Sequence, residues 1–210
     1  MHIKTIIAGP IETNAFVVGD ESSHEAMIVD APPDSVHQIL DALRDDGFSV
    51  KLIVLTHCHF DHVVDAAAIK KKTDAPIAMH PDAVEHLKDA IKSGQVSYKL
   101  EDIGPDQLLN DGDEIAIGSL RFTVMLTPGH APGQISLYEE NERVVFGGDT
   151  LFPGGYGRAD LPGSSADETQ RSMKRLLELP DDVTVYPGHG LPAQIGNERS
   201  WMEEVAEKGI

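Results

Sequence analysis

The sequence has one cysteine, few basic residues and no hydrophobic run that approaches the length of a membrane span. A single cysteine excludes a disulfide within the chain and fits a reducing compartment. Residues 1–4 lead into a predicted strand without the apolar core of a signal peptide. We therefore expect a cytoplasmic protein that does not enter a membrane.

The balance of charge excludes polyanionic partners. The chain has 35 Asp and Glu residues against 17 Lys and Arg residues, which gives a formal net charge of −18 at pH 7. A surface with this charge repels nucleic acid and anionic membranes. Solubility, or adaptation to a salty cytoplasm, explains most of these carboxylates. The expected partner is a small molecule, bound by a monomer or a small homo-oligomer.

Length and composition favour one domain over residues 1–210. The chain is 40% hydrophobic, enough for a sizeable core, and no stretch resembles a linker. Apolar runs between turn residues predict strands at 3–8, 15–18, 26–29, 51–55, 114–117, 120–126, 135–138, 144–147 and 183–186. Helical spacing predicts helices at 36–43, with Asp34 as N-cap and Gly47 as stop, and at 66–72, 81–92, 167–179 and 197–208. Two groups of strands, each followed by helices, predict a layered α/β domain.

The segment THCHFDH, residues 56–62, places three imidazoles and a carboxylate directly after the strand at 51–55. In an extended stretch alternate residues share a face, so His57 and His59 point one way and Cys58 the other. Asp61 and His62 follow at the turn into the next helix. Alone, the His-x-His pair fits a hydrogen-bonded or solvated pair as well as a metal site. Cys58 is expected to be a buried thiol.

Three further donors follow apolar strands, each beside glycine. They are His130 in LTPGHAPG, Asp149 in VVFGGDT and His189 in VYPGHG. Strand-end loops hold functional groups on a sheet scaffold, and glycine lets the backbone approach a ligand closely. We therefore expect these side chains to join the donors of residues 57–62.

The combined set offers nitrogen and oxygen donors without a thiolate, and it is too large for one tetrahedral ion. Zinc is the expected metal, and iron and manganese are the alternatives that such donors accept. A structural zinc site is closed and usually rich in thiolates, which argues for a hydrolytic centre with open positions. We predict two divalent ions, one held by His57, His59 and His130 and one by Asp61, His62 and His189, with Asp149 able to bridge.

The chemistry expected of such a centre is attack of metal-bound hydroxide on an acyl carbon, with Asp61 and Asp149 as catalytic residues. The metals also stabilise the oxyanion. A thiolate, whose parent thiol has a pKa of about 8.5, leaves without a dedicated general acid. A thioester is therefore the substrate that best matches two metals and no obvious proton donor.

Four motifs in order, THCHFDH, TPGHAPG, GGDTLF and YPGHG, resemble the metallo-β-lactamase superfamily, and most closely its glyoxalase II (hydroxyacylglutathione hydrolase) branch. The resemblance covers roughly residues 5–198. The stretch GDTLFPGGYGRADLPG is similar to the short, type II proteins of that branch. The resemblance implies an αββα sandwich of two mixed sheets flanked by helices, with the metals at one edge. It also implies an acyl-glutathione substrate such as S-lactoylglutathione.

The sequence departs from the longer glyoxalase II enzymes in two ways. They carry an additional helical C-terminal domain that binds glutathione, and we expect no such domain here. Their site loop has a lysine and a tyrosine for the peptide, where GYGRAD offers Arg158 and Asp160. We predict that Arg158 and Tyr156 bind substrate. The alternative for Arg158 is an ion pair with Asp160 or another loop carboxylate.

Other activities occur on the same fold. Persulfide dioxygenases share much of the motif set but use one iron, held by two histidines and an aspartate, and their site loop differs from GDTLFPGG. The flavodiiron domains usually replace the second histidine of HxHxDH with glutamate, where this chain has His59. A lactonase-type hydrolase is a further alternative. The remaining histidines are expected to be structural or solvated: His2, His24, His37, His80 and His86.

Overall fold

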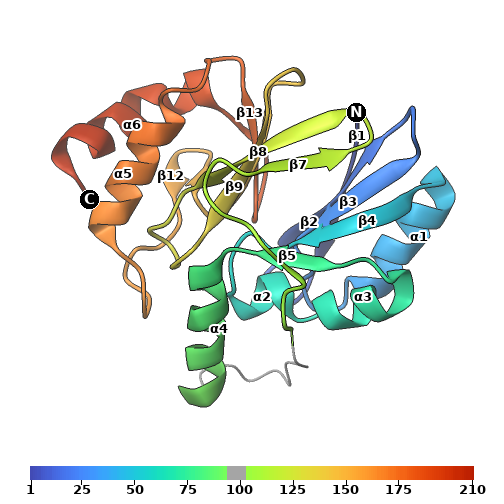
Figure 1. The fold of residues 1–210 in the computed structure, drawn as a ribbon. Helices are drawn as coiled ribbons and strands as arrows, with labels where there is room; N and C mark the ends of the chain where they lie inside the picture. Colours follow the sequence, from blue (N-terminus) through green and yellow to red (C-terminus); the bar gives the residue numbers. More distant parts are fainter. Residues whose placement is uncertain (94–102) are drawn as a thin grey trace.

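Two six-stranded sheets face each other in the computed structural model, which describes residues 1–93 and 103–210 (Figure 1). The first sheet, called sheet A, has the order β1-β2-β3-β4-β5-β6, and sheet B has the order β14-β13-β10-β9-β8-β7. Sheet A consists of β1 (His2–Ala8), β2 (Thr13–Asp20), β3 (Glu25–Val29), β4 (Ser49–Val54), β5 (Ile77–Met79) and β6 (Gln107–Leu108). Sheet B consists of β7 (Glu114–Ile117), β8 (Leu120–Leu126), β9 (Ile135–Glu139), β10 (Val144–Gly148), β13 (Thr184–Pro187) and β14 (Ala193–Gln194). A two-stranded ribbon joins β11 (Leu151–Phe152) to β12 (Gly155–Tyr156).

Helices cover the outer faces of both sheets, as Figure 1 shows. On the side of sheet A lie α1 (Val36–Asp46), α2 (Phe60–Val63), α3 (Ala66–Thr73) and α4 (Pro81–Ser93), and on sheet B lie α5 (Ala166–Leu176) and α6 (Ile195–Lys208). Both sheets are mixed, because β3, β4, β5 and β6 pair in parallel, as do β10 and β13, while the other pairs are antiparallel. The predicted αββα sandwich is therefore confirmed.

Three hydrophobic clusters fill the spaces between the four layers. Strand β2 shows how the sequence supplies two of them at once. Its Val17 side chain joins the cluster under α1 and α3, whereas Phe16 and Val18 join the cluster between the sheets. Successive side chains of a strand point to opposite faces, so a strand buried on both sides is apolar without interruption. The third cluster packs α5 and α6 on sheet B.

The start of α1 differs from the prediction. Ser35, not Asp34, is the N-cap residue, and Asp34 has a left-handed backbone with a φ of 65°. The cap comes instead from Asp65, whose carboxylate accepts the backbone N–H groups of Ser35 at 2.8 Å and Val36 at 3.2 Å. The predicted stop is confirmed, because Gly47 is the C-cap in a left-handed conformation.

The strands that precede the predicted donors end at a common edge of the sandwich. Strand β4 leads into residues 56–62, β10 into Asp149 and β13 into His189. None of the helices in the described parts of the chain is long and apolar enough to cross a membrane.

Candidate metal centre

Sheet A contributes four donors to the site. His57 and His59 lie between β4 and α2, where the backbone bends at residues 56–57 and is extended at His59, the N-cap of α2, with a ψ of 145°. Asp61 and His62 belong to the short helix α2 itself. The change from extended to helical backbone at His59 turns the last two donors toward the first two. Residues that are close in sequence thus form a concave wall.

Sheet B contributes the other three donors. His130 lies in the loop between β8 and β9, Asp149 follows β10, and His189 follows β13. Gly188, beside His189, lies so close to the centre that a Cβ there would collide with Asp149 Oδ1 and the ring of His62. Only glycine therefore lets β13 deliver its histidine at this position.

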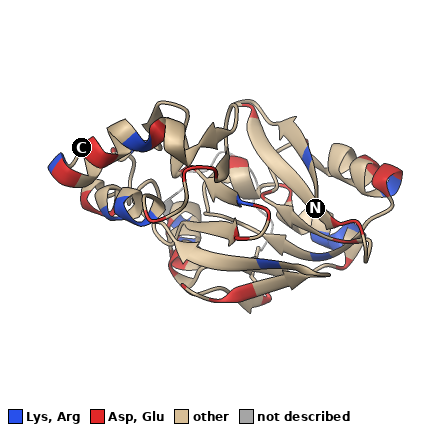
Figure 2. Cartoon of the chain, turned by 90° about the horizontal axis from the view of Figure 1, so that it is seen from above, with Lys and Arg blue, Asp and Glu red and all other residues tan. Residues whose placement is uncertain are grey.

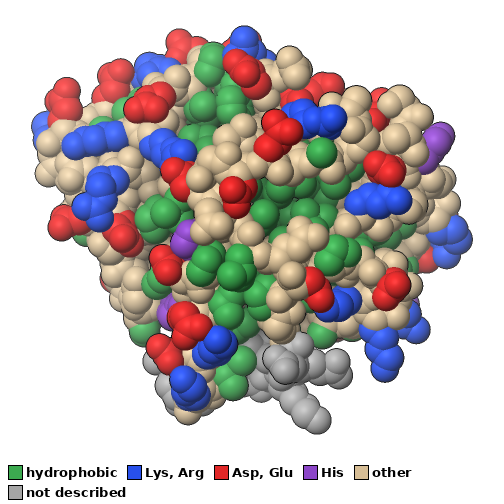
Figure 3. Space-filling view, viewed as in Figure 1, with side chains coloured by type: hydrophobic (Ala, Val, Ile, Leu, Met, Phe, Trp, Pro, Cys, Tyr) green, Lys and Arg blue, Asp and Glu red, His purple; other side chains and the backbone are tan. Residues whose placement is uncertain are grey.

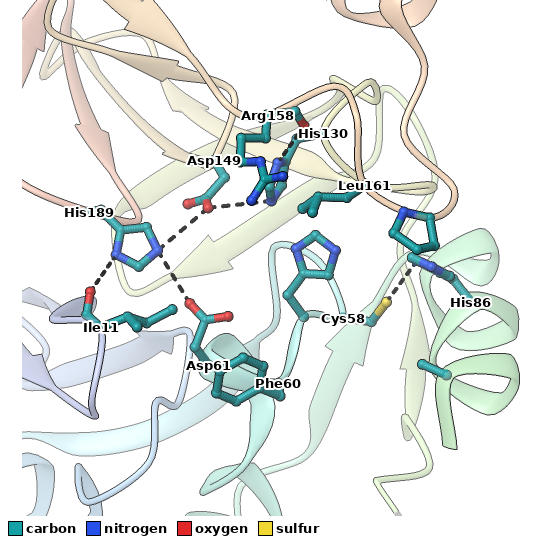
Figure 4. Close-up of a pocket in the computed structure, with 13 residues that line it drawn as sticks. Ile11, Cys58, Phe60, Asp61, His86, His130, Asp149, Arg158, Leu161 and His189 are labelled. Carbon is teal, nitrogen blue, oxygen red and sulfur yellow. Dashed lines mark hydrogen bonds and ion pairs between the residues drawn. The ribbon is translucent and has the colours of Figure 1, made fainter. Parts of the chain in front are cut away.

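The structure brings all seven predicted donors together. Figure 4 shows those that face the cavity, with Asp61, His130, Asp149 and His189 labelled. Donor atoms lie within 4.8 Å of one another in three groups: His57, His59 and His130; His57, His62 and Asp149; and Asp61, His62 and His189. Asp149 is central, because its carboxylate oxygens lie 3.4 Å from His62 Nε2, 3.4 Å from His130 Nε2 and 3.5 Å from His189 Nε2. Two of the three groups are the predicted triads, and the third joins Asp149 to one histidine of each.

Several buried polar atoms at this centre lack a hydrogen-bond partner. They are the Nε2 atoms of His57, His62 and His130 and the Oδ1 atom of Asp149. Buried polar atoms are normally satisfied, and leaving one unpaired is costly. Imidazole nitrogen and carboxylate oxygen are ligands that divalent transition metals accept. The residues present therefore fit two divalent ions.

The protonation states of His57, His59 and Asp149 suit cation binding, whereas His62 has to lose a proton before it can coordinate. Burial lowers the pKa of His57 well below its usual value and that of His59 to about 3, so both rings are neutral and can coordinate. Burial alone would raise the pKa of Asp149, but the charge of His62 outweighs it and keeps this carboxylate ionised. The pKa of His62 is raised well above its usual value. Burial alone would lower it, but the negative charges of Asp30 and Asp149 have the larger effect.

A second set of oxygen atoms orients the histidine rings. Asp30 Oδ2 lies 2.8 Å from His62 Nδ1, and its carboxylate also accepts the N–H and Oγ1–H of Thr56, both at 2.8 Å. The Thr56 hydroxyl in turn lies 3.1 Å from His57 Nδ1. Because the Nδ1 atoms are engaged outward, the Nε2 atoms point into the centre.

Backbone carbonyls serve the sheet B histidines in the same way. His130 Nδ1 donates to the carbonyl of Arg158 at 2.9 Å, and His189 Nδ1 to that of Ile11 at 3.2 Å. Thr13 Oγ1 donates to Asp61 Oδ2 at 2.9 Å. The sequence prediction missed these supporting residues. Asp30 had a visible signal, since it ends an apolar strand as Asp149 does.

The predicted substrate-binding residues lie in different places. Arg158 lines a cavity above the donors, and its guanidinium binds Asp160, with Nε–Oδ1 at 2.8 Å and Nη2–Oδ2 at 3.0 Å. This is the ion pair that the sequence left open as the alternative. Tyr156 lies elsewhere, with its ring centroid 6.2 Å from that of Trp201 in the cluster under α5 and α6. Among the described residues that line the cavity, Tyr156 is absent.

Cys58 and His86 form a pair beside the donors. Cys58 is 3% exposed, as expected for a buried thiol, and burial raises its pKa to about 12. Its Sγ atom lies 3.3 Å from His86 Nδ1 on α4. His86, expected to be structural or solvated, also lines the cavity. His80, also expected to be structural or solvated, precedes α4, and its Nδ1 accepts the N–H of Asp82 at 3.1 Å.

The order and spacing of these donors are those of a known family, and the family model described as the Metallo-beta-lactamase superfamily matches residues 8–189. This chain belongs to the metallo-β-lactamase superfamily. The resemblance seen in the sequence is thereby confirmed at the level of the superfamily.

Several relatives within the superfamily match over nearly their whole length. An uncharacterized protein of Aquifex aeolicus is 44% identical, over 96% of this chain and 95% of its own. The probable metallo-hydrolase YqgX of Bacillus subtilis is 33% identical, over 95% of each chain. The hydroxyacylglutathione hydrolase GloC of Haemophilus influenzae is 28% identical, again over 95% of each.

Solved structures of the superfamily share the fold. The B3 metallo-β-lactamase BLEG-1 gives a TM-score of 0.86 at 33% identity, covering 95% of this chain and 97% of its own. ETHE1 from Myxococcus xanthus gives 0.82 at 27% identity, with 99% and 86% covered. TTHA1623 in a di-iron-bound form gives 0.81 at 33% identity, with 93% and 96% covered.

Proposed function

We propose that this protein is a metal-dependent hydrolase that cleaves thioesters at a centre for two ions. The observation that carries the proposal is the pair of donor triads beside a cavity, with Asp149 in contact with histidines of both. The likeness to a probable metallo-hydrolase and to a hydroxyacylglutathione hydrolase supports this class of reaction.

We retain the predicted division of the donors between two ions. His57, His59 and His130 would hold the first, Asp61, His62 and His189 the second, and Asp149 would contribute to both. When bound, such ions supply Lewis acidity and lower the pKa of water toward about 7. Zinc remains the expected metal, and the di-iron form of TTHA1623 supports iron as the alternative.

The side chains themselves position the reaction. Asp61 lies 3.3 Å from His189 Nε2 and is held by the Thr13 hydroxyl, which fixes its carboxylate at the floor of the cavity. Ionised Asp61 and Asp149 can each accept a proton there. A thiolate leaving group needs no proton from the protein, since thiols are moderately acidic, with a pKa of about 8.5.

A second candidate is persulfide dioxygenation at a single iron. The group formed by His57, His62 and Asp149 contains two histidines and one carboxylate, the type of ligand set such enzymes use. The likeness in fold to ETHE1 is compatible with this candidate but does not assign a reaction. Oxygen consumption separates the two candidates directly.

The test combines metal analysis with two assays on the same purified protein. We expect two ions per chain, release of thiol from S-lactoylglutathione or another small acyl thioester, and no oxygen uptake with glutathione persulfide. One tightly held ion with no activation by a second, or persulfide-dependent oxygen uptake, would overturn the proposal.

Variants locate the activity in the centre. Asp149→Ala should weaken both ions together, because its carboxylate reaches histidines of both groups. His59→Ala should abolish hydrolysis, whereas His37→Ala, which removes an exposed histidine of α1, should leave metal content and activity unchanged.

A further inference from the structure

A cavity of about 400 Å³ lies over the metal centre. Five of the donors face it, and Figure 4 shows Leu161 and Phe60 on opposite sides of the histidines, with Ile11 nearby. The rest of the wall comes from α4 and from the loop after β12. The apolar side chains that line it are Ile11, Phe60, Ala90, Leu161 and Pro162.

Positive charge is scarce in this wall. Among the described residues that line the cavity, Arg158 is the only Lys or Arg. Its guanidinium donates two hydrogen bonds to the Asp160 carboxylate, at 2.8 and 3.0 Å. The Arg158 side chain is 69% exposed and that of Asp160 is 71% exposed. Among the described residues of the wall, the Arg158 guanidinium is therefore already paired, and its exposure places it at the rim.

This distribution of charge discriminates between substrates. A carboxylate held against this described part of the wall, away from the proposed ions, would have to displace Asp160 or lose its water without a partner, and burying an unpaired charge is unfavourable. An uncharged apolar group would instead bury its surface against Leu161, Phe60 and Ile11, which is favourable. The wall resembles a typical small-molecule site, apolar with a few polar groups at its base.

We propose that the cavity binds an uncharged, apolar arm of the substrate, on the acyl or the thiol side of the scissile bond. The inference rests on the proposed thioester hydrolase activity. It favours thioesters with an uncharged arm over those of glutathione, a peptide with two carboxylates. Leu161 and Phe60 lie on two sides of the apolar slot, and α4 contributes Ala90 to its lining.

The first experiment compares thioesters on the metal-loaded protein. Hexanoyl- and succinyl-N-acetylcysteamine differ in the charge of the acyl arm, and acetyl esters of hexanethiol and glutathione differ in the thiol arm. We expect kcat/KM at least tenfold higher for the apolar member of one pair, mainly through KM. The pair that responds identifies the arm that occupies the cavity. A preference for succinyl or glutathione thioesters would overturn the proposal.

Matched leucine variants test the wall itself. Leu161→Lys adds a cation inside the cavity, and we expect the preference to move toward the succinyl thioester by tenfold or more. Leu191→Lys is the control, because Leu191 is 76% exposed and is not among the described lining residues. It should leave the preference unchanged, and both variants should keep the metal content. Ala90→Phe, a second probe, should shorten the longest acyl chain accepted.

A binding measurement separates this inference from the proposed function. The neutral dye N-phenyl-1-naphthylamine fluoresces in apolar sites, and hexanoyl thioester should displace it from the wild type and from Leu191→Lys. Leu161→Lys should bind it at least tenfold more weakly. If the dye binds in this pattern but no thioester is cleaved, the proposed function fails and the apolar cavity stands. If hydrolysis occurs without such binding, the inference fails.

Discussion

Asp30 is the residue whose removal should most clearly loosen the metal centre without removing a donor. Its carboxylate engages His62 Nδ1 and two groups of Thr56, and an amide cannot accept all three hydrogen bonds. We expect Asp30→Asn to lower metal affinity by about 10–100-fold, measured by competition with a chelator. Asp34→Asn is the matched control, since both residues have a positive φ and Asp34 is exposed on the surface. Equal losses in both variants would contradict the assignment.

Arg158→Ala tests whether the loop cation recognises substrate. Only its backbone carbonyl contacts His130, so metal content should not change. Because Asp160 occupies the guanidinium, we expect KM for charged and neutral thioesters to change by less than about threefold. A tenfold rise for an anionic thioester alone, about 1.4 kcal/mol, would instead support the carboxylate recognition predicted from GYGRAD.

At the scale of single residues, the sequence predicted the donors better than their surroundings. His57, His59, Asp61 and His62 are adjacent in sequence, and the remaining donors sit beside glycine after strands, so local pattern was enough. Supporting contacts such as Thr13 with Asp61 join residues 48 positions apart, and no local pattern encodes them. Tyr156 illustrates the converse, because proximity to Arg158 in sequence did not place its ring at the cavity.

Among the helices, α1 depends on a cap supplied by another helix. Asp65 precedes α3 and satisfies the first N–H groups of α1. We expect Asp65→Ala to lower the free energy of unfolding by about 1–2 kcal/mol, because the capping carboxylate is lost. Urea unfolding measures the change. Glu85→Ala, which breaks an exposed pair with Lys88, should cost less than about 0.5 kcal/mol. A loss no larger than this control would contradict the capping role.

Helix and strand types were predictable, and their ends were less so. The hairpin of β7 and β8 has the predicted bounds, because alternation and the Gly118 turn both mark it. Helix α5 ends at Leu176, three residues before the prediction. The predicted helix was too long because the apolar pattern of the sequence continues past Leu176. Leu177 and Leu179 pack in the cluster on sheet B although the helix has ended. Strands of two or three residues, such as β5 and β6, are too short to show a period.

For the molecule as a whole, Asp20 fastens the two sheets at the end of β2 remote from the metal centre. Its carboxylate accepts the N–H groups of Ser119, at 2.6 Å, and Ser22, at 2.9 Å, and these bonds hold its pKa well below the usual range. The ionised form is thus favoured in the folded state. The resulting stability is present above the unfolded pKa of about 3.9 and is lost as the pH falls toward the folded pKa.

The variant Asp20→Asn isolates this contribution. The difference in unfolding free energy between wild type and Asp20→Asn should be full at pH 7 and should shrink as the pH falls below about 4. Urea unfolding at pH 7, 4 and 3 measures it. Asp45→Asn on the exposed side of α1 should show little difference at any of these pH values. A constant difference for Asp20→Asn would contradict the linkage.

Charge on the molecular surface does not point to one macromolecular partner. Acidic residues, coloured red on the cartoon of Figure 2, occur on helices and turns in many parts of the described chain. In Figure 3 they are interspersed with basic ones, and apolar side chains show between them. The absence of nucleic acid and membrane as partners remains a prediction, and the distribution agrees with the expectation that most carboxylates serve solubility.

The contact between residues 11–14 and 187–190 has a consequence for the order of events during synthesis. The Asn14 side chain donates hydrogen bonds to the carbonyls of Pro187 and Gly190. The Ile11 carbonyl accepts one from His189 Nδ1, a residue 178 positions later in the sequence. A nascent chain displays His57, His59 and His62 long before His189 has been translated. Contacts between such distant segments must repay a loop-closure cost and are slow to form. On the proposed division of the donors, the second ion would be retained only once residues 187–190 have reached residues 11–14, so that metal retention would report that this contact has formed.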